Sequence, residues 1–515
     1  MNKRFFITTA IDYVNGRPHL GHAYEKIVAD TIARARRSLG REVYFLTGLD
    51  EHGQKVRQAA QAEGKPPQAY CDALAADWVA FAKKLGLSNE DFIRTTQPRH
   101  KKYVQAILTK LNNAGHFYKA VYRGYYSARE ETFLTEKDRL PDGTFDSAYG
   151  EVIELEEQNY YFKLRDHQQW LIGFIEENPL FVQPAYRRNE VLGFLKNNAL
   201  DDLCISRPAS RLNWGIPVPF DPDFVTYVWF DALVNYISAP ASAGEPDLCA
   251  AVDIPAAPDG PELWPADIHV IGKDILKFHA VYWPIMLRAT GLPLPKQILV
   301  HGWWQKDGQK LSKSTGNIVD PVAVIDEWGL DAFRYYALRE LDIGPDGNWT
   351  DAGFRSRYSA ELANGLGNLV HRSLSMLKRY RNGIVPPKSD DLASDAQKAA
   401  GETRSMLEQN RLQAALQCIW ALVTRGNQYV DQTAPFKMAK DPAQAQRLDG
   451  VLYSLAETCR VLAVLLWPFL PATAANIYAQ LGLKEAPGRF ADSAWGALPP
   501  GQAIAEPAAL FPRKD

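Results

Sequence analysis

Two histidines three residues apart, His19 and His22, stand where the sequence predicts the start of a helix. The apolar run RFFITTAI before them is typical of a buried strand, and Pro18 occupies the position expected for a first helical residue. A helix N-terminus at the carboxyl end of a parallel strand offers unpaired backbone N–H groups to a phosphate, and imidazole N–H groups can add donors. Two surface histidines or a zinc pair are the alternatives, although this turn adds only Glu25 as a further zinc ligand.

A second group of charged residues follows the apolar run ILVHGWW, which is typical of another buried strand. The stretch KDGQKLSKSTGN at 306–317 places Lys310 and Lys313 three residues apart among serines and glycines. Such a loop can close over an oligophosphate and neutralise the charge that builds up in a transition state. By itself the pattern is more often a solvated turn. Together with the two histidines, it would lie at the carboxyl edge of one sheet, where α/β folds bind ligands.

The elements that must position these residues alternate between strands and helices. From residue 4 to about 115, β-prone apolar runs alternate with helical patterns, which predicts the first half of a doubly wound parallel sheet. An aromatic, alternating pattern then predicts a β-rich insertion, after which strand signals such as DIHVIG predict that the sheet resumes. After about 350 the pattern is helical throughout, with the breakers GIVPPKSDD and APGRF. We therefore divide the chain at 1–115, 116–210, 211–305, 306–352 and 353–515.

Length and composition fit a soluble enzyme of several domains, with 515 residues, 46% hydrophobic, 23% charged and a net charge of −2. The longest apolar run, at 461–472, is too short to span a bilayer and contains two prolines. The first residues predict a strand and not a secretory signal or transit peptide, so we expect a cytoplasmic protein. Five cysteines without a C-x-x-C pair argue against a disulfide framework and against a cysteine-built zinc site.

The motifs HLGH at 19–22 and KLSKS at 310–314 resemble the two signatures of the class I aminoacyl-tRNA synthetases. Six stretches narrow the resemblance to the methionyl-tRNA synthetases and spread it over essentially the whole chain: AIDYVNGRPHLGH, TGLDEHGQK, SRLNWGIPVP, YVWFDALVNY, IGKDILKFHAVYWP and NLVHR. The resemblance implies an α/β protein with a doubly wound parallel, Rossmann-like catalytic domain in two halves. It further implies a β-rich connective insertion at 116–210, a signature loop and stem-contact region at 306–352, and an all-α anticodon-binding bundle at 353–515.

The reaction that this resemblance implies is the ATP-dependent ligation of L-methionine to tRNA(Met), initiator tRNA included. The methionine carboxylate would attack the α-phosphorus of ATP to form methionyl-adenylate and diphosphate, and transfer to tRNA would release AMP. Because the nucleophile is already charged, positioning and charge stabilisation suffice, and no Ser/His/Asp triad is required. Mg²⁺ would arrive with ATP and not in a protein cage.

On the same resemblance, His19 and His22 bind the phosphates of ATP, and Lys310 and Lys313 grip the pyrophosphate, so that these four residues form the catalytic group. Gly21 lets the adenine lie close to the backbone. A carboxylate and a glycine at the strand end IGKD match positions that bind ribose. The full ATP site is His19, Gly21, His22, Glu25, Gly272, Asp274, His301, Gly302, Lys310 and Lys313.

The methionine site is implied in the same way, with Asp50 holding the substrate ammonium. The side-chain pocket matches Ile11, Tyr13, Trp229, Ala232, Leu233, Tyr236, Ile275 and His279, with Trp283 closing it. Each aromatic residue alone would be more typical of a hydrophobic core. As a set they suit a thioether, because sulfur contacts aromatic rings well and accepts hydrogen bonds only weakly.

In the helical end, Asn368 and Arg372 are four residues apart and share a helix face. The resemblance places both at anticodon-reading positions, where an amide and a guanidinium can bond and stack on splayed bases. Phe436 stands where relatives carry a stacking tryptophan, and phenylalanine can stack with less area.

Two departures from the family pattern lead to further expectations. The stretch GYYSAREETFL in the insertion has no cysteine, so we expect no structural zinc, and the chain ends soon after the bundle, so we expect a monomer. The rival hypotheses are another class I synthetase, such as that for cysteine, leucine, isoleucine or valine, and a paralogue that binds tRNA without catalysis. ATP–pyrophosphate exchange with each amino acid in turn separates these hypotheses.

Overall fold

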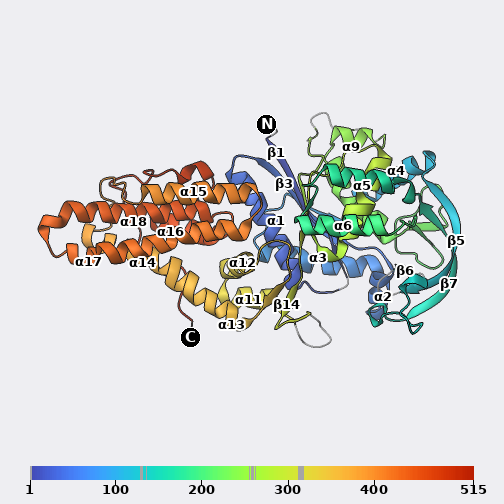
Figure 1. Ribbon diagram of the computed structural model, residues 1–515, viewed down its shortest axis with the longest axis horizontal. Helices are drawn as coiled ribbons and strands as arrows, with labels where there is room; N and C mark the ends of the chain where they lie inside the picture. The colour runs from blue at the N-terminus through green and yellow to red at the C-terminus, as the bar shows by residue number, and fades with distance from the viewer. Residues whose placement is uncertain are drawn as a thin grey trace.

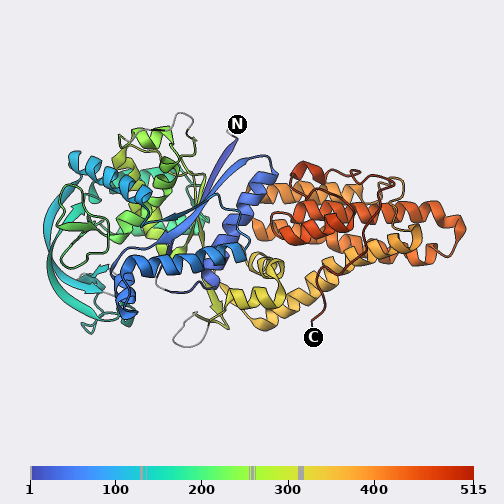
Figure 2. The same cartoon turned by 180° about the vertical axis from the view of Figure 1, so that it is seen from behind.

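The computed structural model describes residues 3–14, 16–127, 132–134, 136–253, 256, 260, 262–310 and 318–514. The molecule is elongated, with an α/β part at one end and a helical bundle at the other, and the C-terminal segment returns from the bundle toward the junction of the two (Figure 1). The view from behind shows the same two-part arrangement (Figure 2). No helix within the described ranges is long and apolar enough to cross a bilayer.

A parallel sheet forms the centre of the α/β part, as the sequence predicts. In the described chain it has seven strands, in the order β2-β3-β1-β12-β13-β8, with β4 also paired to β3. All of its pairings are parallel; Arg4–Thr8 align with Glu42–Leu46, for example, and Ile7–Thr9 with Ile268–Val270. The strands are β1 (Arg4–Thr9), β2 (Asp12–Tyr13), β3 (Glu42–Asp50), β4 (Asp91–Arg94), β8 (Val182–Gln183), β12 (Ile268–Gly272) and β13 (Ile298–His301).

Helices cover both faces of this sheet, which explains why successive residues of β1, from Phe5 to Thr9, are all buried. Phe5 and Ile7 belong to a core that continues through α1 into the bundle, whereas Phe6 belongs to a second core with α4 and the insertion helices. The helices near the sheet are α1 (Leu20–Ser38), α2 (Gln54–Ala62), α3 (Pro67–Lys84), α4 (Pro98–Asn113), α7 (Val228–Leu233), α8 (Asn235–Ser242), α9 (Pro246–Ala250), the π-helix η5 (Phe278–Tyr282) and α10 (Trp283–Thr290).

The connective insertion combines strands with helices. Its antiparallel sheet has the order β6-β5-β7-β9 and forms the long curved ribbon at the outer end of the α/β part (Figure 1). Only the first part of the insertion predicted at 116–210 is β-rich, because the stretch QQWLIGFIEE has its apolar residues at helical spacing and forms a helix. The elements are β5 (Phe117–Ser127), β6 (Thr132–Leu134), β7 (Val152–Phe162), α5 (Gln168–Glu177), α6 (Ala185–Asn197), β9 (Leu203–Cys204), β10 (Ser206–Pro208) and β11 (Phe224–Thr226). Within the same range, β8 belongs to the central sheet, beside β13.

A small three-stranded sheet and two helices connect the α/β part to the bundle. They are β14 (Trp304–Lys306), β15 (Gln309–Lys310), β16 (Gly347–Trp349), α11 (Pro321–Trp328) and α12 (Leu330–Arg339). The guanidinium of Arg334 on α12 is fully buried, lies 2.8 Å from the carboxylate of Asp30 on α1, and donates to the carbonyl of Phe469 in the bundle at 2.8 Å. One buried charge therefore bonds all three parts.

The C-terminal end is a helical bundle followed by an irregular segment. Its helices are α13 (Asp351–Arg357), the π-helix η6 (Tyr358–Gly367), α14 (Asn368–Arg381), α15 (Ala393–Glu408), α16 (Leu412–Thr433), α17 (Pro435–Met438), α18 (Ala445–Leu466) and α19 (Pro471–Gln480). The prediction of helix throughout is wrong after residue 482, where the described chain has only the short turn Phe490–Ser493. Repeated prolines and glycines there break the helical pattern, and buried Glu457 instead accepts backbone N–H groups of this segment at 2.7, 3.0 and 3.1 Å.

Candidate active site

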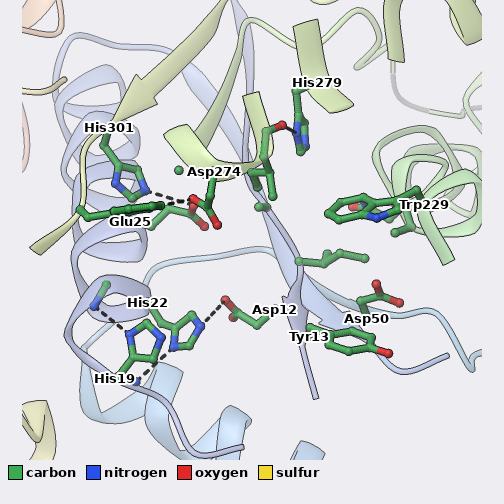
Figure 3. Close-up of a pocket in the computed structure, with 18 of the residues that line it drawn as sticks. Asp12, Tyr13, His19, His22, Glu25, Asp50, Trp229, Asp274, His279 and His301 are labelled. Carbon is green, nitrogen blue, oxygen red and sulfur yellow. Dashed lines mark hydrogen bonds and ion pairs between the residues drawn. The ribbon is translucent and has the colours of Figure 1, made fainter. Parts of the chain in front are cut away.

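A cavity of about 840 Å³ opens at the carboxyl ends of the central strands, beside the N-terminus of α1. The predicted ATP-site residues from His19 to Gly302 all line it, and every residue predicted for the methionine site lines it except Trp283. In Figure 3, His19, His22, His301 and Glu25 lie on one side of the cavity, and Tyr13, Asp50 and Trp229 lie on the other. The fold therefore gathers residues from 11 to 302 around one volume.

Both histidines of HLGH are built into the start of α1. The sequence predicts Pro18 as the first helical residue, but the helix begins at Leu20 and His19 is its N-cap. The Nδ1 atom of His19 accepts from the backbone N–H of Gly21, and Nδ1 of His22 accepts from the backbone N–H of His19, both at 3.1 Å. This is a capping box made of imidazoles, and because both Nδ1 atoms accept, the N–H donor of each ring is at Nε2, which in His22 lies 4.0 Å from the Asp12 carboxylate.

Glycine at 21 relieves crowding between the two histidines. A Cβ atom at Gly21 would lie 3.0 Å and 3.2 Å from atoms of the His19 ring. The two imidazole rings are also close, with centroids 3.7 Å apart and planes tilted by 30°. The short, crowded turn thus holds two N–H donors at a helix N-terminus, the arrangement that binds phosphate.

Charged side chains are buried beneath this turn. The ammonium of Lys26 lies 2.7 Å from Asp12 and 3.7 Å from Glu25. Burial raises the pKa of Asp12 to about 7, although the Lys26 ammonium lowers it. Sequence reasoning missed both Asp12 and Lys26; the only available signal was that Lys26 follows His22 by one helical turn.

His301 adds a positive charge to the same side of the cavity. Its two ring nitrogens face two acceptors, the Glu25 carboxylate at 3.2 Å and the carbonyl of Gly302 at 2.8 Å. Burial alone would lower the pKa of His301, but the bond and charge of Glu25 outweigh it and raise the pKa above its usual value. The doubly protonated ring satisfies both acceptors, so we assign an imidazolium here.

The strand end IGKD brings a carboxylate to the rim. Asp274 accepts from the indole N–H of Trp303 at 3.2 Å, and a Cβ atom at Gly272 would lie only 2.5 Å from the Asp274 carboxylate. A Cβ atom at Gly302 would lie 2.2 Å from the carbonyl oxygen of Pro345. Glycine is therefore needed at 302, where the backbone of Pro345 comes close, whereas at 272 the Asp274 side chain would have to turn away.

The opposite side of the cavity is mainly aromatic and apolar, and Asp50 adds a carboxylate to it. His279 donates from Nδ1 to the carbonyl of Ile275 at 2.9 Å, so its Nε2 accepts the hydroxyl of Tyr236 at 2.7 Å. Burial lowers the pKa of His279 to about 4, which keeps the ring neutral. The indole of Trp229 stacks on Phe278 with centroids 3.5 Å apart.

The sequence predicts that Trp283 closes the cavity. In the structure it lies behind Tyr236 and does not close the cavity. It is buried, and its indole N–H donates to Nε2 of His269 at 3.3 Å. The His269 ring stacks against Tyr236 at 4.2 Å and bonds Thr8 through Nδ1 at 2.8 Å. Burial holds the pKa of His269 well below its usual value. Sequence reasoning missed His269, since a lone histidine in an apolar strand gives no specific signal.

The lysine motif is only partly described. The backbone of Lys310 ends β15, but residues 311–317, including Lys313, lie outside the described residues, and nothing is assigned to the Lys310 side chain. Within the described ranges, no group of three or more His, Cys, Asp or Glu side chains is arranged to hold a metal ion.

The predicted anticodon residues lie on the bundle, outside the cavity. Asn368 and Arg372 belong to α14 and reach toward α16, where they contact Asn427 at 3.4 Å and Asp431 at 3.0 Å. Phe436 on α17 is 45% exposed, so its ring is available at the surface and is not a core residue. The helix α14 packs against α16 and α18, and α17 packs against α18.

Comparison with known proteins gives similarity over the full chain. The methionine–tRNA ligase of Rhizobium meliloti is 43% identical over 525 residues, covering 99% of this chain and 98% of that protein. The corresponding ligase of Bacillus subtilis is 41% identical over 532 residues, covering 99% and 78%. A solved structure of Mycobacterium tuberculosis methionyl-tRNA synthetase in complex with methionyl-adenylate superposes with a TM-score of 0.90 at 38% identity, covering 99% of this chain and 100% of that one.

The parallel sheet, the histidine-capped helix and the cavity between them define the catalytic domain of a class I aminoacyl-tRNA synthetase. The family described as tRNA synthetases class I (M) matches residues 5–156 and 146–374, and the family described as the anticodon binding domain of methionyl tRNA ligase matches residues 381–514. The chain belongs to the methionyl-tRNA synthetase family.

Proposed function

We propose that this chain ligates L-methionine to tRNA(Met), the initiator tRNA included, through a methionyl-adenylate, releasing diphosphate and then AMP. The observation that carries the proposal is the single cavity that joins a histidine-capped helix N-terminus to a neutral aromatic pocket. The first feature suits the phosphates of ATP, and the second suits a thioether. We further propose that the enzyme acts as a monomer in the cytoplasm.

In the first step, the helix N-terminus with His19 and His22 receives the phosphates. The Nε2–H groups donate to phosphate oxygens, and the cationic His301 adds charge stabilisation. Lys310 and Lys313 close over the departing diphosphate, and Asp274 with Gly272 holds the ribose.

Mg²⁺ fits this site as a partner of the nucleotide. The described chain offers no protein cage for it, and Mg²⁺ is usually bound through substrate phosphates, water and at most one or two carboxylates. When bound, it neutralises charge on the phosphates.

Methionine lies across the cavity, with its ammonium at Asp50 and its side chain among Trp229, Tyr236 and His279. The neutral His279 explains how the pocket rejects amino acids with charged or strongly polar side chains. Such a side chain would lose its hydration without gaining a charged partner. The Tyr236 hydroxyl, committed to His279, is held at a fixed position in the pocket wall.

Anticodon reading is assigned to the bundle face that carries Asn368, Arg372 and Phe436. The exposed ring of Phe436 stacks on a base, while the amide and guanidinium bond base edges.

ATP–pyrophosphate exchange with each amino acid in turn tests the proposal. Methionine alone should support rapid exchange, and tRNA(Met) should then be charged. Exchange with a different amino acid would favour another class I synthetase, and an absence of exchange with tRNA binding retained would favour a catalytically inactive paralogue.

A further inference from the structure

A buried carboxylate behind the cavity connects two of the segments that line its aromatic side, the segment after Asp50 and the helices α7 and α8. Asp231 lies on α7, between Trp229 and Ala232 in the chain, and its side chain is fully buried. One carboxylate oxygen lies 2.6 Å from Nδ1 of His52, and the other lies 2.8 Å from Nε2 of His100. Asp231 does not line the cavity, so it is not a direct ligand of the substrate.

Each partner of Asp231 belongs to a different one of these segments. His52 follows Asp50 by two residues, directly after β3. His100 lies in the first turn of α4, and its Nδ1 bonds the hydroxyl of Ser238 on α8 at 2.7 Å. The helix α8 also carries Tyr236. The carboxylate therefore bonds the segment after Asp50 to the helices that form the side-chain pocket.

The segment that carries Asp50 is also fixed from its other side. The carboxylate of Glu51 accepts from Arg94 at 2.7 Å, and the carbonyl of Glu51 accepts from the indole of Trp214 at 2.6 Å. Asp50 thus has one neighbour anchored away from the pocket helices and, through His52, one anchored to them. The second anchor joins this segment to α7 directly.

The positions of the protons in this network follow from the chemistry of the Asp231 carboxylate. A carboxylate can only accept, so both imidazoles donate to Asp231. Burial alone would raise the pKa of Asp231, but the two imidazoles outweigh it and hold the pKa at about 2, so the group stays charged at neutral pH. Bonds to a buried charge are stronger and more rigid than bonds between neutral groups.

We propose that Asp231 is a positioning residue for methionine, which sets the distance between the ammonium-binding Asp50 and the wall that receives the side chain. This inference rests on the proposed role of Asp50. The ammonium and the thioether belong to one substrate of fixed length, so an error in the spacing of the two walls weakens both contacts at once. ATP, bound at the opposite side of the cavity, should not depend on it.

The variant Asp231→Asn tests this role with little change of shape. Its amide has one acceptor and one donor, so one imidazole must turn its lone pair toward it. His100 can do so by changing tautomer, because the Ser238 hydroxyl can donate or accept. We expect the KM for methionine in ATP–pyrophosphate exchange to rise about tenfold, with the KM for ATP within about twofold of its original value.

Asp331→Asn is a matched control. Asp331 is also a buried carboxyl, and it accepts the backbone N–H of Thr473 at 2.6 Å where α12 meets α19, away from the cavity. It should lower the melting temperature without changing the KM for methionine. At His52, asparagine keeps a donor near the position of Nδ1 and should behave nearly as the original residue, whereas leucine removes the donor and should raise the KM for methionine as Asp231→Asn does.

Asp50→Asn, measured in parallel, separates this inference from the proposed function. If Asp50→Asn raises the KM for methionine but neither Asp231→Asn nor His52→Leu does, the positioning role is refuted and the ammonium site stands. Equal rises in the KM for methionine and for ATP would reduce Asp231 to a general structural residue and also refute it. If Asp50→Asn has no effect, the ammonium assignment fails, and the inference fails with it.

Discussion

Replacing Arg372 with alanine should separate tRNA charging from amino acid activation. Arg372 is about one-third exposed and forms an ion pair with Asp431 at 3.0 Å, and exposed pairs of this kind contribute about 0–1 kcal/mol to stability. The variant should therefore fold normally. A lost base contact costs about 1–3 kcal/mol, so kcat/KM for tRNA(Met) should fall about 5- to 150-fold.

The assay is aminoacylation at fixed ionic strength, beside ATP–pyrophosphate exchange without tRNA. Exchange should stay within about twofold of the original rate, because Arg372 lies on α14 and does not line the cavity. Arg372→Lys should recover little if the guanidinium reads a base edge, and most of the activity if it only contacts a phosphate.

Arg404→Ala provides the control on the same bundle. Arg404 also forms an exposed ion pair at 3.0 Å, with Glu408 on α15, and it is not assigned to the anticodon surface. Charging by Arg372→Ala that equals charging by this control would remove the anticodon role. A loss of exchange would show instead that the two ends of the molecule are coupled through Arg372.

Three further outcomes are expected. Lys313→Ala should raise the activation free energy of adenylate formation by several kcal/mol, on the order of a lost transition-state charge contact, and leave the affinity for methionine nearly unchanged. An equal loss of methionine binding in calorimetry would contradict that role. Phe436→Ala should weaken tRNA binding by about 1–3 kcal/mol if the ring stacks on a base, and unchanged binding in a filter assay would exclude stacking. Burial lowers the pKa of His279 from 6.5 to about 4. At a pH between these two values the unfolded chain binds a proton that the native chain does not, so stability must fall as pH falls. The free energy of unfolding, measured by denaturation, should fall between pH 7 and pH 5 by about 2 kcal/mol more in the original protein than in His279→Gln. Equal losses in the two proteins would refute the assignment of His279 as a neutral ring.

The sequence predicts the main architecture because buried parallel strands and helix starts leave strong local patterns. The apolar run before His19 and the strand end before Asp274 both lie where the parallel sheet requires. The second part of the insertion was less predictable, because the aromatic residues of α5 suit a strand or a helix until the spacing is weighed over the whole segment.

Side-chain partners were the least predictable feature of the site. The capping box of His19 and His22 replaces the usual serine and glutamate, so no familiar signature reveals it. His269 and Asp231 act through contacts with residues far away in the chain, as in the pair between Asp231 and His52, which are 179 residues apart. Trp283 shows the opposite error, since a residue within a strong motif packs behind the pocket and not in it.

A crystal structure with a non-hydrolysable methionyl-adenylate analogue would test the central assignment most directly. We predict that the analogue spans the cavity, with its phosphate-mimicking group near Nε2 of His19 or His22, its ammonium within hydrogen-bond distance of Asp50, and its thioether against Trp229 and Tyr236. An analogue bound with its ammonium away from Asp50, or with its side chain outside the aromatic wall, would contradict this account.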